Sequence, residues 1–105
     1  MAKKKKNGKI GILYSPGFGA GWSTWVMEWK CKEFMIFDRK LIDAVEKHDL
    51  ELLQRIMAEN YPDAYLGGMS NLRVMYLDPG TVFKINEYDG HESISIAGSD
   101  EFFTA

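Results

Sequence analysis

Residues 15–25 have the sequence Ser15-Pro16-Gly17-Phe18-Gly19-Ala20-Gly21-Trp22-Ser23-Thr24-Trp25, the most distinctive stretch of the 105-residue chain. Three alternating glycines remove Cβ atoms from a short loop, so its backbone can adopt positive φ angles and approach a ligand or another chain closely. Pro16 fixes its own φ and favours an extended Ser15, which makes the exit from the preceding segment abrupt. The stretch predicts a binding loop, and we interpret the rest of the chain as its scaffold.

This loop carries the residue types of an anion-binding site. Successive backbone N–H groups can form a concave nest for an anion, hydroxyl groups add donors, and aromatic rings provide flat surfaces on which a base can stack. The predicted ligand-binding residues are Ser15, Gly17, Phe18, Gly19, Gly21, Trp22, Ser23, Thr24 and Trp25. A structural alternative stays open, because glycine beside tryptophan is also typical of an indole that packs on bare backbone.

Composition predicts one folded domain in a reducing compartment. An apolar content of 46%, with 13% aromatic residues, is sufficient for one core. A single cysteine, Cys31, excludes an internal disulfide framework, and we expect it to be a small buried hydrophobe. No apolar stretch has the length of a transmembrane helix, and no signal-peptide hydrophobic region follows the N-terminal lysines. We therefore expect a cytoplasmic protein that does not bind membranes.

The net charge of −2 conceals an asymmetry between the N-terminus and the body of the chain. Lys3, Lys4, Lys5 and Lys6 supply four of the thirteen basic residues, and the remaining nine are outnumbered by fifteen acidic ones. An acidic body argues against specific nucleic-acid binding, which needs a basic face. We interpret residues 1–8 as a disordered basic tail.

Hydrophobic periodicity predicts strands in the first third of the chain. Residues 9–14 are apolar on both faces, which is typical of a central strand. For residues 22–32 two periods compete: Trp22, Trp25 and Trp29 fit a helical stripe, whereas Trp25, Met27 and Trp29 alternate with polar residues as in a strand. Because the alternation is cleaner and tryptophan favours strands, we predict an extended segment that continues as a strand over residues 33–37.

The rest of the chain predicts two helices followed by a hairpin. Asp38 is a suitable N-cap for a helix over residues 39–48, and Asp49 for a second helix that ends before Pro62. Strands are expected over residues 72–77, 81–88 and 91–97, the last two joined by an Asp89-Gly90 turn. The prediction is a single α+β domain over residues 9–98, a mostly antiparallel sheet with two helices on one face, and a C-terminal tail over residues 99–105.

The predicted hairpin register places two carboxylates opposite each other. A two-residue turn at Asp89-Gly90 pairs Glu87 with Glu92 on the face that carries Ile85. Like charges in this position are unfavourable unless a cation lies between them or the hairpin tip is exposed to solvent. We keep both alternatives open, with a basic side chain, a metal ion or a partner's basic group as the cation.

No motif in the sequence predicts catalysis. Alternation puts His91 on the opposite face from Glu92, so these side chains do not converge on a metal. The glycine loop lacks the lysine of a phosphate-binding P-loop, and its third glycine is out of register with the dinucleotide-binding fingerprint. We expect no catalytic residues, no metal ligands and no cofactor.

Two segments, residues 14–25 and 83–94, resemble parts of small uncharacterised proteins carried by phages and prophages. This resemblance covers most of the chain between residues 10 and 96 but brings no assigned activity or site residues. It implies a cytoplasmic protein that acts on the host, either by blocking a host protein or by sequestering a nucleotide signal.

These observations predict a non-enzymatic binding protein. The first hypothesis is that the glycine-rich aromatic loop holds a small anionic, nucleotide-derived ligand. The alternative is a protein-interaction module that inhibits a host protein through the same loop, with tryptophan as an anchor. Aromatic rings that converge on a cavity favour the ligand, whereas an exposed aromatic patch favours the partner. Homodimerisation is compatible with both.

Overall fold

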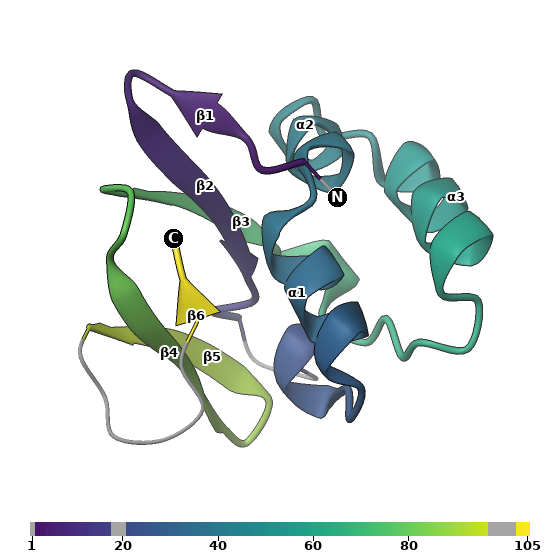
Figure 1. Ribbon diagram of the computed structural model, residues 1–105. Coiled ribbons are helices and arrows are strands. Elements are labelled where there is room, and N and C mark those ends of the chain that lie inside the picture. Colours follow the sequence, from purple (N-terminus) through teal and green to yellow (C-terminus); the bar gives the residue numbers. More distant parts are fainter. Residues whose placement is uncertain (1, 18–20, 97–102) are drawn as a thin grey trace.

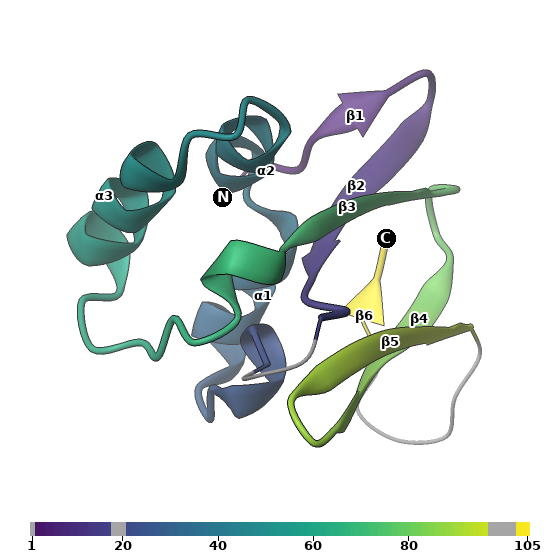
Figure 2. The same cartoon turned by 180° about the vertical axis from the view of Figure 1, so that it is seen from behind.

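The computed structural model describes residues 2–17, 21–96 and 103–105. Over these residues it contains three α-helices and two three-stranded antiparallel sheets, which confirms the predicted α+β class (Figure 1). The helices gather on one side of the molecule and the sheets on the other, as the opposite view shows (Figure 2). The expected single sheet is wrong, because the chain leaves the first sheet at the Asp78-Pro79-Gly80 turn and enters a second one.

The first sheet has the strand order β1-β2-β3, with β1 at Lys5–Lys6, β2 at Lys9–Tyr14 and β3 at Arg73–Leu77. As predicted, β2 is central and largely buried. The prediction of a disordered tail over residues 1–8 is wrong for β1, which pairs with the start of β2 across a turn. Asn7 and Gly8 in that turn both have positive φ, as a two-residue hairpin requires.

The second sheet has the order β5-β4-β6, with β4 at Val82–Tyr88, β5 at His91–Ile96 and β6 at Phe103–Thr104. The hairpin register is confirmed, including the pairing of Glu87 with Glu92. Asp89 and Gly90 have φ angles of 53° and 82°, the left-handed pair of a type I′ turn. Phe103 is buried against β4, so the described end of the C-terminal segment belongs to the fold.

The helices are α1 at Trp29–Phe37, α2 at Arg39–Glu46 and α3 at Leu50–Asn60, with short 3-10 helices η1 at Ser23–Trp25 and η2 at Met69–Asn71. The predicted extended segment over residues 22–32 and strand over residues 33–37 are therefore wrong. Trp25, Met27 and Trp29 created the alternating pattern, and all three are exposed. The alternating apolar residues therefore lie on the protein surface and do not form the buried face of a strand.

Both predicted N-caps are confirmed. The side chains of Asp38 and Asp49 accept hydrogen bonds of 3.1 Å from the backbone N–H groups of Leu41 and Leu52, respectively. Helix α3 ends at Asn60, before Pro62, as the proline requires. Among the described helices, none has the length and apolar composition needed to cross a membrane.

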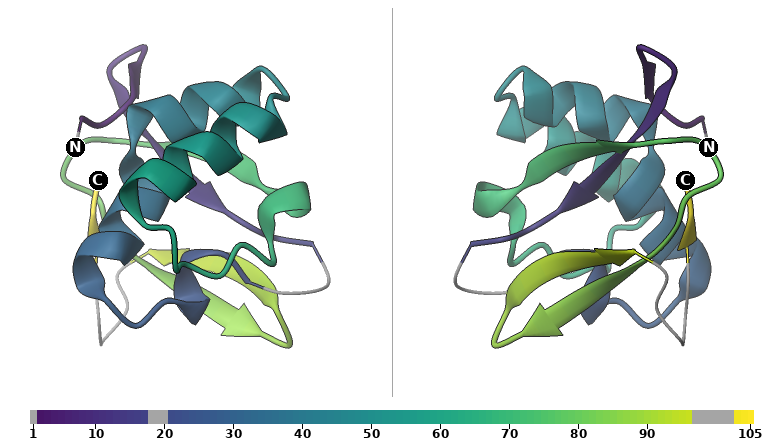
Figure 3. Two further views of the ribbon diagram at one scale, coloured as in Figure 1. Left: turned by 90° about the vertical axis from the view of Figure 1, so that its right-hand side faces the viewer. Right: turned by 90° about the vertical axis from the view of Figure 1, so that its left-hand side faces the viewer.

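Helix α1 stands between two parts of the hydrophobic core. Cys31 and Met35 point into a cluster formed with β2, α2 and α3, whereas Ile36 and Phe37 point into a second cluster formed with both sheets. Helix α3 forms the outermost helical layer over α2 (Figure 3). This arrangement fixes the first turn of α1 beside the loop that follows α3, and the two segments enclose the candidate site.

Candidate functional site

The described part of the glycine loop binds a carboxylate of the same chain. Glu92 is completely buried, and its Oε1 accepts a 2.9 Å hydrogen bond from the backbone N–H of Ser15. Its Oε2 accepts from the backbone N–H of Trp22 at 2.6 Å, and from the N–H and hydroxyl of Thr24 at 3.2 and 2.5 Å. The Glu92 N–H in turn donates to the Ser15 carbonyl at 2.8 Å. The loop therefore forms an anion-binding nest, and Glu92 occupies the described donors.

This contact explains how the hairpin tolerates two opposed glutamates. Glu92 turns into the loop, where backbone donors compensate its charge, while Glu87 is exposed and accepts a 2.8 Å hydrogen bond from the Gly90 N–H. No described residue forms an ion pair with either carboxylate, since the described salt bridges lie elsewhere, between Lys4 and Asp43 and between Lys9 and Asp78. In the described part of the chain, hydrogen-bond donors of the loop stabilise the Glu92 carboxylate, and solvent and the Gly90 N–H stabilise that of Glu87, so no cation is needed between them.

Most of the described residues that the sequence predicted as ligand-binding are buried or closely packed, and few are accessible to a ligand. Ser15, Trp22 and Ser23 are buried, and the Trp22 indole N–H donates to the Met35 carbonyl at 2.7 Å. A Cβ at Gly21 would collide with the Trp25 ring, and one at Gly17 with the Asn71 side chain. Phe18 and Gly19 lie outside the described residues. Among the described members of the set, only Trp25 is a large apolar side chain exposed to solvent, with 49% of its surface accessible.

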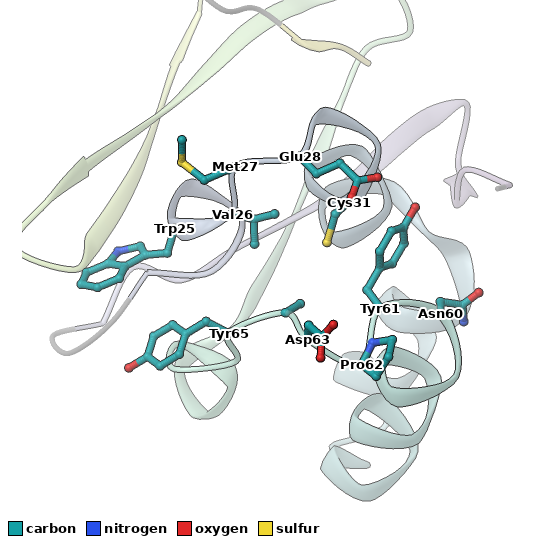
Figure 4. Close-up of a pocket in the computed structure, with 11 residues that line it drawn as sticks. Trp25, Val26, Met27, Glu28, Cys31, Asn60, Tyr61, Pro62, Asp63 and Tyr65 are labelled. Carbon is teal, nitrogen blue, oxygen red and sulfur yellow. The ribbon is translucent and has the colours of Figure 1, made fainter.

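Trp25 borders an open groove of about 390 Å³, which we call the aromatic groove (Figure 4). One wall is the segment from η1 to the first turn of α1, and the other is the loop that leaves α3. At one end the Trp25 ring stacks on Tyr65, with 5.7 Å between centroids. At the other end, Tyr61 lies beside Glu28 and Cys31. The described lining is Trp25, Val26, Met27, Glu28, Cys31, Asn60, Tyr61, Pro62, Asp63, Ala64 and Tyr65.

The aromatic groove is electrostatically negative. Its described lining contains the carboxylates of Glu28 and Asp63 but no lysine, arginine or histidine. Burial, reinforced by the negative charge of Glu28, raises the pKa of the Cys31 thiol. Desolvation, followed by the charges of Glu28 and Cys31, likewise raises the pKa of the Tyr61 phenol. Both groups are thus kept protonated at neutral pH, which makes Cys31 a poor nucleophile.

The rim of the groove is apolar and exposed. Met27 has 96% of its surface accessible and Tyr65 has 54%. Sequence reasoning missed Tyr61, Asp63 and Tyr65, because they lie about 40 residues after Trp25 and no periodicity connects the two segments. Within the described ranges, no group of three or more histidine, cysteine, aspartate or glutamate side chains has an arrangement that could hold a metal ion.

No protein-family model, no curated protein and no solved structure matches this chain, so its functional assignment rests on the geometry described above.

Proposed function

We propose that the protein is a non-enzymatic interaction module that binds a partner protein through the aromatic groove. The supporting observation is the exposure of Trp25, Met27 and Tyr65 around one concave site. Large apolar side chains scattered singly over a surface are ordinary, but their concentration beside a groove is typical of binding sites. Tryptophan, tyrosine and methionine are also enriched at the centres of protein interfaces.

The charge of the site favours a partner protein over an anionic ligand. A nucleotide entering the aromatic groove would approach Glu28 and Asp63, two carboxylates of the same sign as its phosphates. At the glycine loop, an external anion would have to displace Glu92 from the donors of Ser15, Trp22 and Thr24. Binding of an anionic ligand is therefore electrostatically unfavourable both in the aromatic groove and at the glycine loop.

The resemblance to phage-carried proteins extends the proposal to the partner and its location. In this proposal the partner is a host protein, and the complex forms in the host cytoplasm. The exposed aromatic rim supplies the anchor, and the partner's function is blocked when its surface is covered.

Photo-crosslinking tests the proposed function. Benzoylphenylalanine is introduced at Met27, on the rim, and as a matched control at Glu51, an exposed position near the start of α3. We expect irradiation in a cell extract to produce one dominant adduct from position 27 that is absent from position 51. The captured protein, once purified, should bind the unmodified chain in calorimetry. Equal adducts from both positions, or a captured protein without measurable affinity, would contradict the proposal.

A further inference from the structure

Resting on the proposed function, we infer that the aromatic groove accepts an arginine side chain of the partner, with its guanidinium group between Glu28 and Asp63. The inference names the chemistry of the anchor, which the apolar rim alone does not specify. It is carried by two features of the groove lining: its carboxylates, which form no ion pair with a described residue, and its aromatic rings.

The two carboxylates of the groove are not paired with a cation of the described residues. Glu28 occupies the N-cap position of α1 without a side-chain capping hydrogen bond, and Asp63 belongs to the loop after α3, so the two carboxylates come from opposite walls (Figure 4). Both residues are exposed, and neither forms a salt bridge with any described residue. Charges of one sign on facing walls raise the local concentration of the opposite charge and favour a cationic occupant. After desolvation, the negative charge of Glu28 is the next cause that raises the pKa of Cys31 and Tyr61, in agreement with a negative potential inside the groove.

The aromatic rings favour arginine among the cationic side chains. The groove presents the rings of Trp25, Tyr61 and Tyr65, and a guanidinium group can stack on such rings while its N–H groups donate to carboxylates. The planar fork of arginine also forms bidentate contacts with a carboxylate, which the ammonium group of lysine does not. The groove volume of about 390 Å³ lies within the range of sites that enclose a small ligand group.

The inference is tested with acetyl-argininamide as the probe and acetyl-citrullinamide, its uncharged isostere, as the control. Each is titrated at millimolar concentrations into the isotopically labelled protein, and amide and indole resonances are recorded by NMR. We expect acetyl-argininamide to shift the Trp25 indole and the amides of residues 25–28, 61 and 63–65 in a saturable manner. Acetyl-citrullinamide should bind on the order of fivefold more weakly, which corresponds to the loss of an exposed cation–π and charge interaction.

Charge variants identify the groups that bind the probe. The double variant Glu28→Gln/Asp63→Asn should lose most of the affinity for acetyl-argininamide, whereas Glu51→Gln, an exposed neutralisation elsewhere, should retain it. Equal binding of the arginine and citrulline probes, no saturable shift by either, or full binding by the double variant would overturn the inference. Equally tight binding of acetyl-lysinamide would overturn the assignment to a planar guanidinium group.

The captured partner separates failure of this inference from failure of the proposed function. If Trp25→Ala weakens the partner complex but Glu28→Gln/Asp63→Asn does not, the anchor is not cationic and the interaction function stands. If neither change weakens the complex, the groove is not the interface and the proposed function is itself contradicted.

Discussion

Glu92→Ala is expected to lower the free energy of unfolding by about 3–5 kcal/mol, a large share of the roughly 5–15 kcal/mol available to a small domain. The substitution removes the acceptor of four hydrogen bonds from Ser15, Trp22 and Thr24. These donors face the completely buried position of Glu92. Without an acceptor they would stay buried and unsatisfied, and the free energy of their desolvation would no longer be compensated. Urea unfolding followed by circular dichroism measures the change.

Two further variants separate this contact from a general effect of the hairpin. Glu92→Gln keeps the shape but replaces one acceptor oxygen by a donor NH₂ group, so we expect an intermediate loss of stability. Glu87→Gln changes the residue directly opposite on β4, which is exposed, and should cost less than about 1 kcal/mol. A Glu92→Ala protein no less stable than Glu87→Gln would contradict the account of the loop.

The Glu92 contact also positions the wall of the aromatic groove. Thr24 donates two of the hydrogen bonds to Glu92, and the next residue, Trp25, stacks on Tyr65 at one end of the groove. Loss of the carboxylate is therefore expected to disturb Trp25 as well as the fold. For this reason the groove is tested with substitutions at its own surface rather than with Glu92 variants.

Trp25→Ala is expected to weaken the complex with the captured partner by about 30-fold or more, equivalent to at least about 2 kcal/mol. The indole provides the largest aromatic surface of the groove, and interface anchors of this type dominate binding free energy. Because Trp25 is 49% exposed in the free protein, its removal should cost the fold much less than a fully buried tryptophan would. Calorimetry gives the affinity, and thermal unfolding checks that the variant is folded.

Leu50→Ala is the matched control for this experiment. Leu50 is also a large exposed apolar residue, but it lies at the start of α3, whereas the groove lies at the end of that helix. We expect the affinity of the Leu50→Ala variant for the captured partner to stay within about twofold of the wild-type value, as for a residue outside the interface. An equal loss for Leu50→Ala and Trp25→Ala would show that the groove has no special role.

The correctly predicted parts of the fold are those set by interactions between neighbouring residues. The Asp89-Gly90 turn fixed the register of β4 and β5, and Asp38 and Asp49 marked the starts of two helices. Each of these signals acts over a few residues, through positive φ or a single capping hydrogen bond. The same register placed Glu92 on an apolar face, which was the one sequence sign of an unusual environment.

The missed features depend on contacts between distant parts of the chain. The alternation of Trp25, Met27 and Trp29 predicted an extended segment, but these side chains are exposed. The segment from residue 29 is instead a helix, α1, whose packing buries Cys31 and Met35. Glu92 is about 70 residues from the loop it binds, and the aromatic groove joins segments that the chain separates by three helices. No periodicity or spacing in the sequence records such contacts.

The most direct measurement of the central claim is an NMR map of the complex between the labelled chain and its captured partner. We predict that the largest amide shifts fall in residues 25–28, 60, 61 and 63–65, together with the Trp25 indole, while the Trp22 indole bonded to Met35 stays unchanged. Shifts concentrated instead in residues 15–24 and around Glu92, with the groove unaffected, would contradict the claim and return the binding site to the glycine loop.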